Sequence, residues 1–371
     1  MEESALVQAK NLANLPFAYK HIALMPDCHS GYGMPIGGVL ATTGVVVPNA
    51  VGVDIGCGMC AVKTSLKTIN SEKLKKVMSG IRELVPLGFN HHQVEQDELL
   101  MPLLVTVPEK GIVVKEYNAA KKQIGTLGGG NHFIEIQKGS DGHIWIMIHS
   151  GSRNIGLKVA EHYNNLAKIL NARWHSAVDK KHDLAYLPIE TQEAKDYLAE
   201  MQYCVDFAFA NRKLMMENIK YAFRKVMGKQ FAELEFINIA HNYARWESHF
   251  GNDVIIHRKG ATSAMEGETG IIPGSQGTKS YIVNGKGNAE SFQSCSHGAG
   301  RKMGRKQAQR ELDLKKEIAN LDRKGIIHSI RNIRDLDEAP GAYKNIDTVM
   351  ENQNDLVEVL VELEPLGVIK G

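Results

Sequence analysis

Residues 143–150 read "HIWIMIHS" and form the clearest strand pattern in the chain. Isoleucine occupies every second position from Ile144 to Ile148, which is typical of a β-strand. The strand ends at His149, and the loop that follows, "HSGSRNIG" (149–156), is rich in glycine and serine. The pattern predicts a rigid strand that delivers a histidine to a polar loop, which is a common way to build an active site.

Further short strands are predicted on both sides of this one. They are rich in β-branched residues, are bounded by glycine or proline, and cover residues 21–27, 37–48, 51–62, 235–242, 253–262 and 280–288. Residues 191–227 follow a helical pattern, and Gly228 is placed to end that helix. A charged helix is predicted from about Gly300 to Leu321. This order predicts an α+β fold: a single intertwined domain over residues 1–371, with a mixed β core and a mainly helical insertion at about 157–228.

Composition narrows the class of protein. Of the 371 residues, 43% are hydrophobic and 23% are charged, which excludes the disordered and fibrous classes. No apolar run approaches the roughly 18 residues needed to span a bilayer, and the first residues, "MEESALVQAK", lack the pattern of a secretion signal. Five cysteines are an odd number, which argues for reduced thiols and against a disulfide framework. We therefore expect a cytoplasmic protein with no membrane segment.

The stretch "VGVDIGCGMC" (51–60) places Asp54 and Cys57 in an otherwise apolar segment. A carboxylate or a thiolate in such surroundings is costly unless it is paired, hydrogen-bonded or bound to a metal. Two interpretations stay open at this point: a metal site, or a turn aspartate that caps backbone amides beside a small buried cysteine. Cys57 and Cys60 have the spacing of half a zinc site, but no second pair of this kind follows, which argues against a zinc ribbon.

Other potential ligands also stand where predicted strands meet glycine-rich loops. They are Asn131, His132 and Glu135 in "GGGNHFIEI" (128–136), His241 and Asn242 in "AHNYARWESH" (240–249), and His297 in "SCSHGAGRKMGR" (294–305). Histidines combined with Asp54 and Cys57 suit zinc, manganese or iron better than calcium or magnesium. A metal beside loops that suit phosphate favours phosphoryl or nucleotidyl transfer. Because the sequence lacks the common nucleotide-binding motifs and a lysine nucleophile motif, histidine is favoured as the nucleophile.

A series of longer motifs then links these features. The motifs are "MPDCHSGYGMPIGG", "VGVDIGCGM", "GGGNHFIEI", "HSGSRNIG", "HNY", "HRKGAT", "IPGSQGTKSY", "SCSHGAGR", "DEAPGAYK" and the terminal "VIKG". In their order and approximate spacing the chain resembles the RtcB family of RNA-splicing ligases, from about His21 to Gly371. Several long motifs in one order are far more specific than any short pattern.

The resemblance implies an RtcB-like fold and a GTP- and manganese-dependent ligase. Such an enzyme joins RNA ends bearing a 2′,3′-cyclic phosphate or a 3′-phosphate to ends bearing a 5′-hydroxyl, in tRNA splicing or RNA repair, through a histidine–GMP intermediate. His297 matches the guanylylated histidine, and Asp27 matches the carboxylate that orients it. The implied ligands of two manganese ions, with the cysteine bridging them, are Asp54, Cys57, His132, His149 and His241. The implied GTP-binding positions are Asn131, Glu135, Asn242, Pro273, Gly274, Ser275, Gly277, Ser280, Gly298, Gly300, Tyr343 and Lys370, with Lys370 near the base.

The implied partners are GTP and RNA with these ends. An activating protein partner is compatible with the family pattern. We expect the protein to be a monomer. Gln276 stands where methionine is usual in the family. The basic stretch "RKMGRK" (301–306), Arg258 and Lys259 are candidate phosphate contacts. Two alternatives stay open: an enzyme that guanylylates 3′-phosphate ends without efficient sealing, and a non-catalytic factor that binds metal and RNA.

Overall fold

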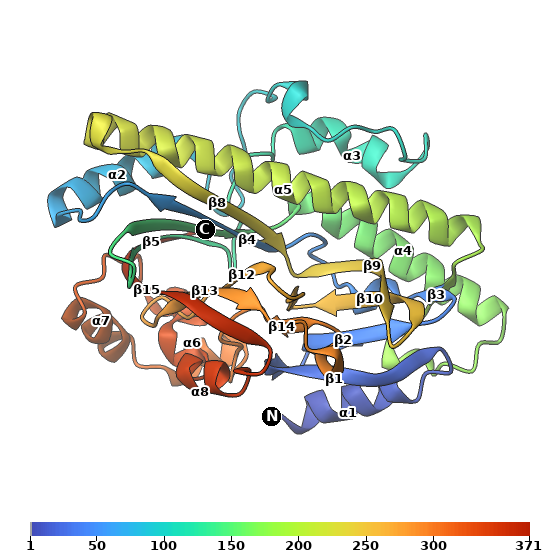
Figure 1. Cartoon of the computed structure of the whole chain (residues 1–371). Coiled ribbons are helices and arrows are strands. Elements are labelled where there is room, and N and C mark those ends of the chain that lie inside the picture. Colours follow the sequence, from blue (N-terminus) through green and yellow to red (C-terminus); the bar gives the residue numbers. More distant parts are fainter. Residues whose placement is uncertain (1) are drawn as a thin grey trace.

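The computed structural model describes residues 2–371 and contains two main antiparallel sheets with helices around them (Figure 1). The larger sheet has seven strands, in the order β12 (Thr269–Ile272), β13 (Ser280–Gly285), β15 (Val357–Lys370), β5 (Phe133–Gly139), β6 (Ile144–Ser150), β4 (Gly58–Thr64) and β8 (Glu233–Ala240). The second has four, in the order β1 (Ala18–His29), β2 (Ile36–Thr42), β10 (Asn252–Lys259) and β9 (Asn242–His249). Two short pairs join β11 (Ala261–Ser263) to β14 (Ser294–Ser296) and β3 (Val45–Val46) to β7 (Leu187–Pro188). The predicted α+β class is confirmed.

The helices lie around the two sheets (Figure 1). They are α1 (Glu3–Ala13), α2 (Ser71–Leu84), α3 (Ile112–Lys121), α4 (Arg153–Arg173), α5 (Gln192–Met227), α6 (Arg305–Glu311), α7 (Leu314–Arg323) and α8 (Ile346–Glu351). Within residues 2–371, no helix combines the length and the apolar character that crossing a bilayer requires.

Strand β6 confirms the strand predicted at 143–150, and all of its residues are buried. It lies between β5 and β4 in the larger sheet. His149 is paired with Phe133 on one side and with Met59 on the other. Because strands hold it from both sides, the imidazole of His149 stands on rigid backbone, which suits a residue that must keep a fixed position.

Helix α5 confirms the helix predicted at 191–227. The Thr191 side chain accepts a hydrogen bond from the Ala194 amide at the start, and Gly228, with φ of +60°, ends the helix. Its apolar side chains, among them Met215 and Phe223, belong to a core cluster shared with β4 and β6. In Figure 1 the helix runs along the upper side of the sheet. Residues of α5 that face inward are therefore close to the strands that carry the site.

The strand predicted at 51–62 begins only at Gly58. Gly52 and Gly56 have φ of +93° and +73°, and these left-handed conformations turn the chain before the strand starts. Asp54 and Cys57 consequently lie in a loop that leads into β4, and the prediction that they stand on a strand is wrong.

The single helix predicted from about 300 to 321 is also wrong, because two helices, α6 and α7, cover this region. The chain leaves the helical conformation at Leu312, and the Asp313 carboxylate accepts a hydrogen bond from the Lys316 amide to begin α7. The residues before Arg305 are non-helical, so Arg301 lies in a loop instead of on a helix face.

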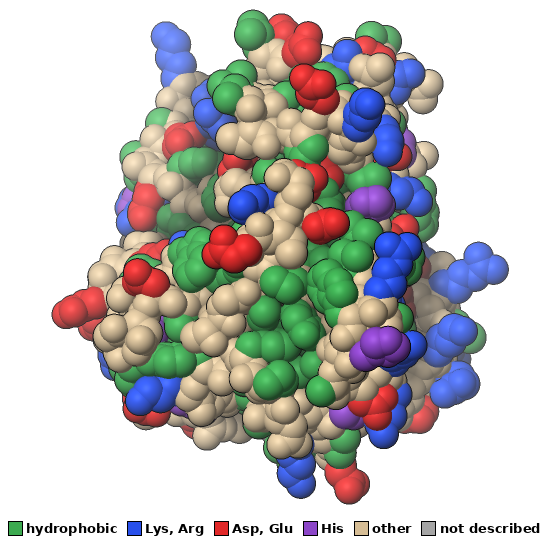
Figure 2. Space-filling view, turned by 90° about the vertical axis from the view of Figure 1, so that its right-hand side faces the viewer, with side chains coloured by type: hydrophobic (Ala, Val, Ile, Leu, Met, Phe, Trp, Pro, Cys, Tyr) green, Lys and Arg blue, Asp and Glu red, His purple; other side chains and the backbone are tan. Residues whose placement is uncertain are grey.

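Charges of both signs are distributed over the surface. On the face shown in Figure 2, lysine and arginine side chains lie mainly along the right-hand side, aspartate and glutamate are scattered, and hydrophobic side chains gather near the centre. The formal net charge of the whole chain is +2. The RNA-binding surface that the resemblance implies therefore has to be sought in local groups of side chains and not in the overall charge.

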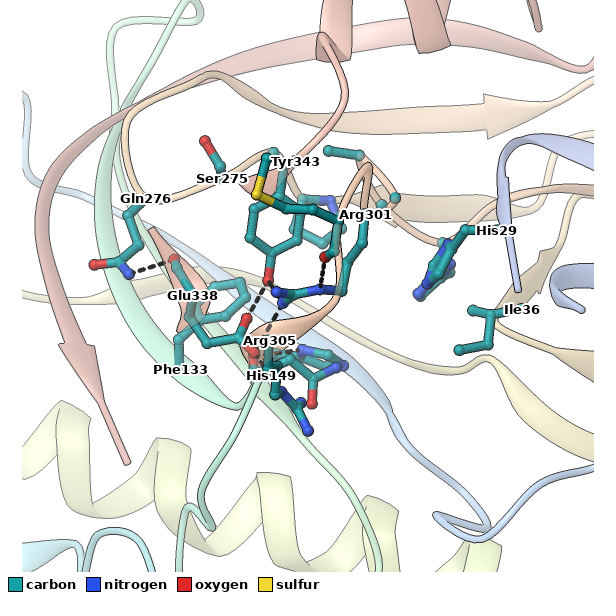
Figure 3. A pocket seen from close by; sticks show the side chains of 18 of the residues that line it. His29, Ile36, Phe133, His149, Ser275, Gln276, Arg301, Arg305, Glu338 and Tyr343 are labelled. Atoms are coloured by element: carbon teal, nitrogen blue, oxygen red, sulfur yellow. Dashed lines mark hydrogen bonds and ion pairs between the residues drawn. The ribbon is translucent and has the colours of Figure 1, made fainter. Parts of the chain in front are cut away.

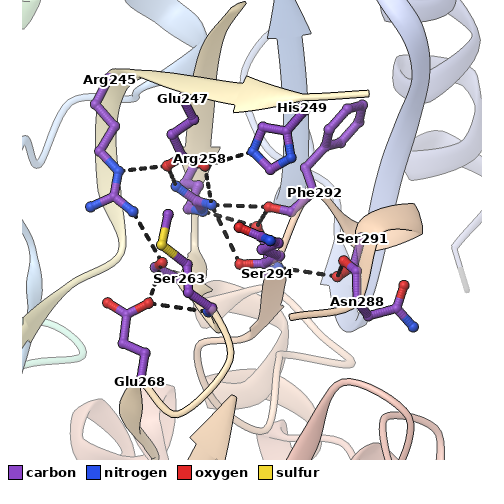
Figure 4. Close-up of polar contacts among 12 residues, drawn as sticks. Arg245, Glu247, His249, Arg258, Ser263, Glu268, Asn288, Ser291, Phe292 and Ser294 are labelled. Atoms are coloured by element: carbon purple, nitrogen blue, oxygen red, sulfur yellow. Dashed lines mark hydrogen bonds and ion pairs between the residues drawn. The ribbon is translucent and has the colours of Figure 1, made fainter. Parts of the chain in front are cut away.

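Arg258 is fully buried in β10, and the prediction that it contacts phosphate is wrong (Figure 4). Its guanidinium donates to both carboxylate oxygens of Glu247 and to the Ser294 hydroxyl at 2.9 Å. The neighbouring Lys259 is also buried, and its ammonium donates to the backbone oxygens of Tyr32 (2.6 Å) and Asn49 (3.0 Å). Both side chains hold the second sheet and its loops together.

The Glu247–Arg258 pair is expected to make a pH-dependent contribution to stability. Burial would raise the pKa of Glu247, but Arg258 and Arg245 outweigh burial and lower that pKa from 4.5 to about 2. A carboxyl group with a lower pKa in the folded state stabilises the fold above the unfolded pKa and loses this effect as the pH falls through the folded pKa. We expect Glu247→Gln to lower the free energy of unfolding by about 3 kcal/mol at neutral pH. In urea unfolding the difference from the wild type should shrink between about pH 5 and pH 2, and a difference that stays constant would contradict this account.

Candidate active site

A cavity of about 490 Å³ opens where the ends of β5, β6 and β15 meet the loops that follow β1 and β14 (Figure 3). Phe133 and Val368 contribute apolar surface to its wall. Of the residues predicted from the sequence, the wall includes Asn131, Glu135, His149, Pro273, Gly274, Ser275, His297, Gly298, Gly300, Tyr343 and Lys370. The fold thus gathers segments from both ends of the chain, because His29 and Lys370 line the same cavity.

Asp27 and His297 form a hydrogen-bonded pair at this cavity. Asp27 lies near the end of β1 and is fully buried, and His297 directly follows β14. The Oδ2 atom of Asp27 accepts from His297 Nδ1 at 2.6 Å and from the backbone amides of His297 (3.1 Å) and Gly298 (3.2 Å). Because Nδ1–H is held by the carboxylate, the neutral ring carries its lone pair on Nε2. The contacts therefore leave the Nε2 lone pair of His297 available for a bond to a ligand.

Beside His297, five side chains that can bind a metal converge. The Sγ atom of Cys57 lies 3.3 Å from His149 Nε2 and 3.5 Å from His132 Nε2. His149 Nε2 is 3.3 Å from His241 Nε2, and His132 Nε2 is 3.0 Å from Asp54 Oδ2. The donor atoms form two groups, Cys57–His149–His241 and Asp54–Cys57–His132, and within each group they all lie within 4.8 Å of one another. Cys57 belongs to both groups.

Local hydrogen bonds fix the loop that carries Asp54 and Cys57. The His241 amide donates to the Cys57 carbonyl at 2.8 Å, and the Asn242 side chain donates to the Asp54 carbonyl at 3.0 Å. Gly151 lets the loop approach, because a Cβ atom at this position would lie 2.1 Å from Asp54 Oδ1. The glycine of the "HSGSR" segment therefore makes room for a carboxylate from a distant part of the sequence.

Burial controls the protonation of this cluster. Together with the neighbouring histidines, it lowers the pKa of His149 and His241 well below the ordinary value, so both rings are neutral at pH 7. His149 Nδ1 lies 3.1 Å from the Asn131 carbonyl, a contact that keeps the proton on Nδ1 and the lone pair on Nε2. Burial also raises the pKa of the Cys57 thiol, so a thiolate here requires a bound cation. Thiolate, imidazole and carboxylate donors in this arrangement fit a transition metal.

Glu135 and Lys370 line another part of the cavity. The Gln137 amide donates to Glu135 Oε2 at 2.6 Å, whereas Oε1 has no partner. Burial raises the pKa of Glu135 to about 8 and lowers the pKa of Lys370. The Lys370 ammonium is 5.7 Å from the centre of the Phe133 ring. A carboxyl oxygen without a partner inside a cavity is suited to a ligand that donates hydrogen bonds.

Glu338 is a central residue of the cavity wall that was not predicted from the sequence. Its carboxylate accepts from Arg301 Nη1 (3.0 Å), from Arg305 Nε (2.8 Å) and from the Tyr343 hydroxyl (Figure 3). The Gln276 amide donates to its backbone oxygen at 2.8 Å. The available signal was its place in the "DEAPGAYK" motif, beside Tyr343. The side chain of Arg305 is 51% exposed, so this arginine can still contact a ligand.

Three positions predicted to contact GTP do not belong to the cavity wall: Asn242, Gly277 and Ser280. The Oδ1 atom of Asn242 accepts from the Gly260 amide at 2.7 Å, and the Ser280 hydroxyl accepts from the Gly274 amide at 3.1 Å. Gly277 lies against α7. Gly277 and Ser280 lie beside the loop that supplies residues 273–276 to the wall, whereas Asn242 holds the loop that carries Asp54.

Comparison with known proteins gives matches along the whole chain. The family model described as tRNA-splicing ligase RtcB matches residues 8–105 and 103–371. The chain is 40% identical to the RNA-splicing ligase RtcB of Escherichia coli strain K12 over 391 aligned positions, which cover 100% of this chain and 95% of the relative. It is 30% identical to the tRNA-splicing ligase RtcB of Thermococcus kodakarensis over 442 positions, which cover 100% and 92%. Every residue of the site described above lies within these matches.

Proposed function

Since the chain belongs to the RtcB family of RNA-splicing ligases, we propose that its cavity performs the joining reaction through His297. The protein is an RNA ligase that joins 3′-phosphate ends to 5′-hydroxyl ends and uses GTP and a metal. The observation that carries the proposal is the position of His297. Its ring centre lies 4.8 Å from that of His241 in the metal-binding cluster, while Asp27 holds its Nδ1. A fixed nucleophile beside metal ligands is what nucleotidyl transfer requires.

In the proposed reaction, His297 Nε2 attacks the α-phosphorus of GTP, and pyrophosphate leaves. Asp27 keeps the proton on Nδ1 and stabilises the positive charge that develops on the ring. The guanylyl group then passes from His297 to the RNA 3′-phosphate. The 5′-hydroxyl of the second RNA end attacks this activated phosphate, the phosphodiester bond forms, and GMP leaves. A 2′,3′-cyclic phosphate must first be opened by one water molecule to give the 3′-phosphate.

The proposed metal ligands are Asp54, Cys57, His132, His149 and His241, and the proposed occupants are two manganese ions. Cys57 belongs to both donor groups, which supports a thiolate that would bind both ions. When bound, such ions stabilise negative charge on phosphate oxygens. The neutral rings of His149 and His241 and the buried thiol of Cys57 add no positive charge to the cluster, which favours cation binding.

We propose that Glu135 and Lys370 recognise the guanine base. Guanine presents two neighbouring N–H donors on one edge and the acceptors O6 and N7 on another. The free Oε1 of Glu135 can accept from the donors, and the Lys370 ammonium can donate to the acceptors. The remaining wall residues, including Asn131, Ser275 and Tyr343, would then surround the ribose and the phosphates.

Glu135→Gln is expected to weaken GTP binding by about tenfold or more, because the amide carries no negative charge and its NH2 group opposes either the donors of the base or the donating amide of Gln137. Binding of ITP, which lacks the 2-amino donor, should change much less. The measurement is calorimetric titration of both nucleotides in a His297→Ala background, which prevents turnover. Glu72→Gln, on the exposed surface of α2, is the matched control. Equal GTP affinity in the Glu135 variant and the control would contradict this assignment.

RNA is proposed to approach over the basic segment 301–306, of which both Arg301 and Arg305 line the cavity. Arg301 is less available, because its nitrogens donate to Glu338 and to the backbone of Met303 and Asp337.

Because the nucleophile and the metal ligands come from segments between Asp27 and His297, we also propose one catalytic domain over residues 1–371. We further propose that the protein is a monomer and that it acts in the cytoplasm. The five cysteines, which are all unpaired and buried, support the cytoplasmic assignment.

Defined RNA ends test the proposed function directly. A labelled strand with a 3′-phosphate is incubated with GTP and Mn²⁺, with and without a strand that bears a 5′-hydroxyl. We expect a joined product only when both strands are present. Guanylylation without joining would indicate a capping enzyme, and the absence of any GTP-dependent product would indicate a non-catalytic factor. Cleaved tRNA anticodon loops and cleaved ribosomal RNA, offered in competition, distinguish tRNA splicing from repair, and addition of candidate partner proteins tests for activation.

A further inference from the structure

Helix α5 places two polar residues, Asn211 and Arg212, in the interior of the protein. Both are fully buried. The inward side of α5 is otherwise mostly apolar and packs on β4 and β6. An arginine at such a position is costly unless its donors are used, and in Arg212 the Nε and Nη1 atoms are used whereas Nη2 has no partner. The hydrogen bonds that Arg212 makes therefore indicate its purpose.

Arg212 donates to three segments that carry proposed metal ligands. Its Nη1 atom donates to the Gly56 carbonyl and to the Ser150 carbonyl, each at 2.9 Å. Its Nε atom donates to the side-chain oxygen of Asn238 at 2.7 Å. Gly56 precedes Cys57, Ser150 follows His149, and Asn238 lies on β8, three residues before His241. All three acceptors are neutral oxygens, so these contacts fix backbone and side-chain positions without forming an ion pair.

Asn211 makes the corresponding contacts to the loop that carries His132. Its side-chain oxygen accepts from the amides of Gly125 (2.7 Å) and Thr126 (3.1 Å), and its amide nitrogen donates to the Gly151 carbonyl at 3.0 Å. Gly125 and Thr126 begin the glycine-rich segment that ends at His132. The two neighbouring residues of one helical turn thus contact every segment from which the donor atoms come.

We propose that Arg212 is a positioning residue that sets the spacing of the donor atoms of Cys57, His149 and His241. This inference rests on the proposed metal site. The guanidinium is planar and directs several donors at fixed angles, so one side chain holds the Gly56 loop and the ends of β6 and β8 in a single arrangement. Outer contacts of this kind typically change metal affinity by about 10- to 100-fold when they are removed.

The test uses Arg212→Lys, because lysine keeps the charge and loses the planar set of donors. Cobalt(II) is the probe, since its visible absorption reports coordination geometry and its near-ultraviolet absorption reports a thiolate ligand. We expect the variant to bind Co²⁺ about tenfold or more weakly, with a changed visible spectrum. Its far-ultraviolet circular dichroism should match that of the wild type. Activity is not needed for this measurement.

The matched control is Arg258→Lys, which alters another fully buried arginine whose main partner is the Glu247 carboxylate. It should be less stable than the wild type and bind Co²⁺ with the wild-type spectrum and affinity. An equal loss of Co²⁺ in both variants, or wild-type Co²⁺ binding by Arg212→Lys, would overturn the positioning role and leave the metal site intact. A wild-type protein without a thiolate band would instead overturn the proposed metal site.

A second variant covers the case in which Arg212→Lys does not fold. Asn238→Ala removes the acceptor of Arg212 Nε together with the hydrogen bond from the Asn238 amide to the Phe209 carbonyl, and leaves both carbonyl contacts of Arg212 in place. We expect a smaller loss of Co²⁺ affinity, about threefold, with a shifted visible spectrum. Unchanged affinity and spectrum in this variant would overturn the inference.

Discussion

His297→Ala is expected to abolish covalent attachment of GMP to the protein, a loss of at least about 1000-fold in the rate of labelling. His297 Nε2 is the nitrogen left with a lone pair once Asp27 holds Nδ1, and alanine removes it. The measurement is incubation with Mn²⁺ and GTP labelled at the α-phosphate, followed by denaturing electrophoresis. The wild-type adduct should be labile in acid and stable in base, as expected for a bond between nitrogen and phosphorus.

Two further variants make this result specific. Asp27→Asn should still form the adduct, but about 100- to 10,000-fold more slowly, because an amide no longer favours the required tautomer. His328→Ala alters another buried histidine, bonded to Asp322 outside the cavity wall, and should be labelled like the wild type. Normal labelling of the His297 variant would place the nucleophile elsewhere.

Local sequence patterns predicted the elements that depend on near neighbours. The alternation of residues 143–150 and the helical period of residues 191–227 each depend on contacts repeated along one segment, and both elements are present in the structure. The same reasoning could not pair Asp27 with His297, which are 270 residues apart. Only the resemblance of whole motifs to a family linked these two residues.

Other parts of the site depend on tertiary contacts that no local pattern encodes. Asp54 and Cys57 lie in a loop because Gly52 and Gly56 adopt left-handed conformations, whereas composition alone favoured a strand. The partners of Arg212 come from three distant segments, so no pattern within the helix could predict its contacts. Sequence therefore predicted the chemistry of the donor set better than the scaffold that holds it.

Cys57→Ala is expected to lower Mn²⁺ affinity by a factor on the order of 100 or more and to abolish guanylylation. Its Sγ atom is the donor common to both ligand groups, so its removal affects His149 and His241 on one side and Asp54 and His132 on the other. The measurement is calorimetric titration with Mn²⁺, with metal analysis of the dialysed protein as an independent reading. Loss of one ion only, with the second bound normally, would contradict a bridging thiolate.

Cys60→Ala is the control, because it removes a thiol from the same motif without touching either ligand group. Cys60 is fully buried in β4, and its thiol contacts the Arg212 carbonyl at 3.9 Å. The smaller side chain should lower the free energy of unfolding by about 1 kcal/mol and leave Mn²⁺ affinity unchanged. Each variant removes one buried sulfur atom, and the two positions are three residues apart. A general packing defect would therefore weaken metal binding in both variants. A loss confined to the Cys57 variant therefore measures coordination itself, whereas equal losses would mean that the thiol of Cys57 only fills space.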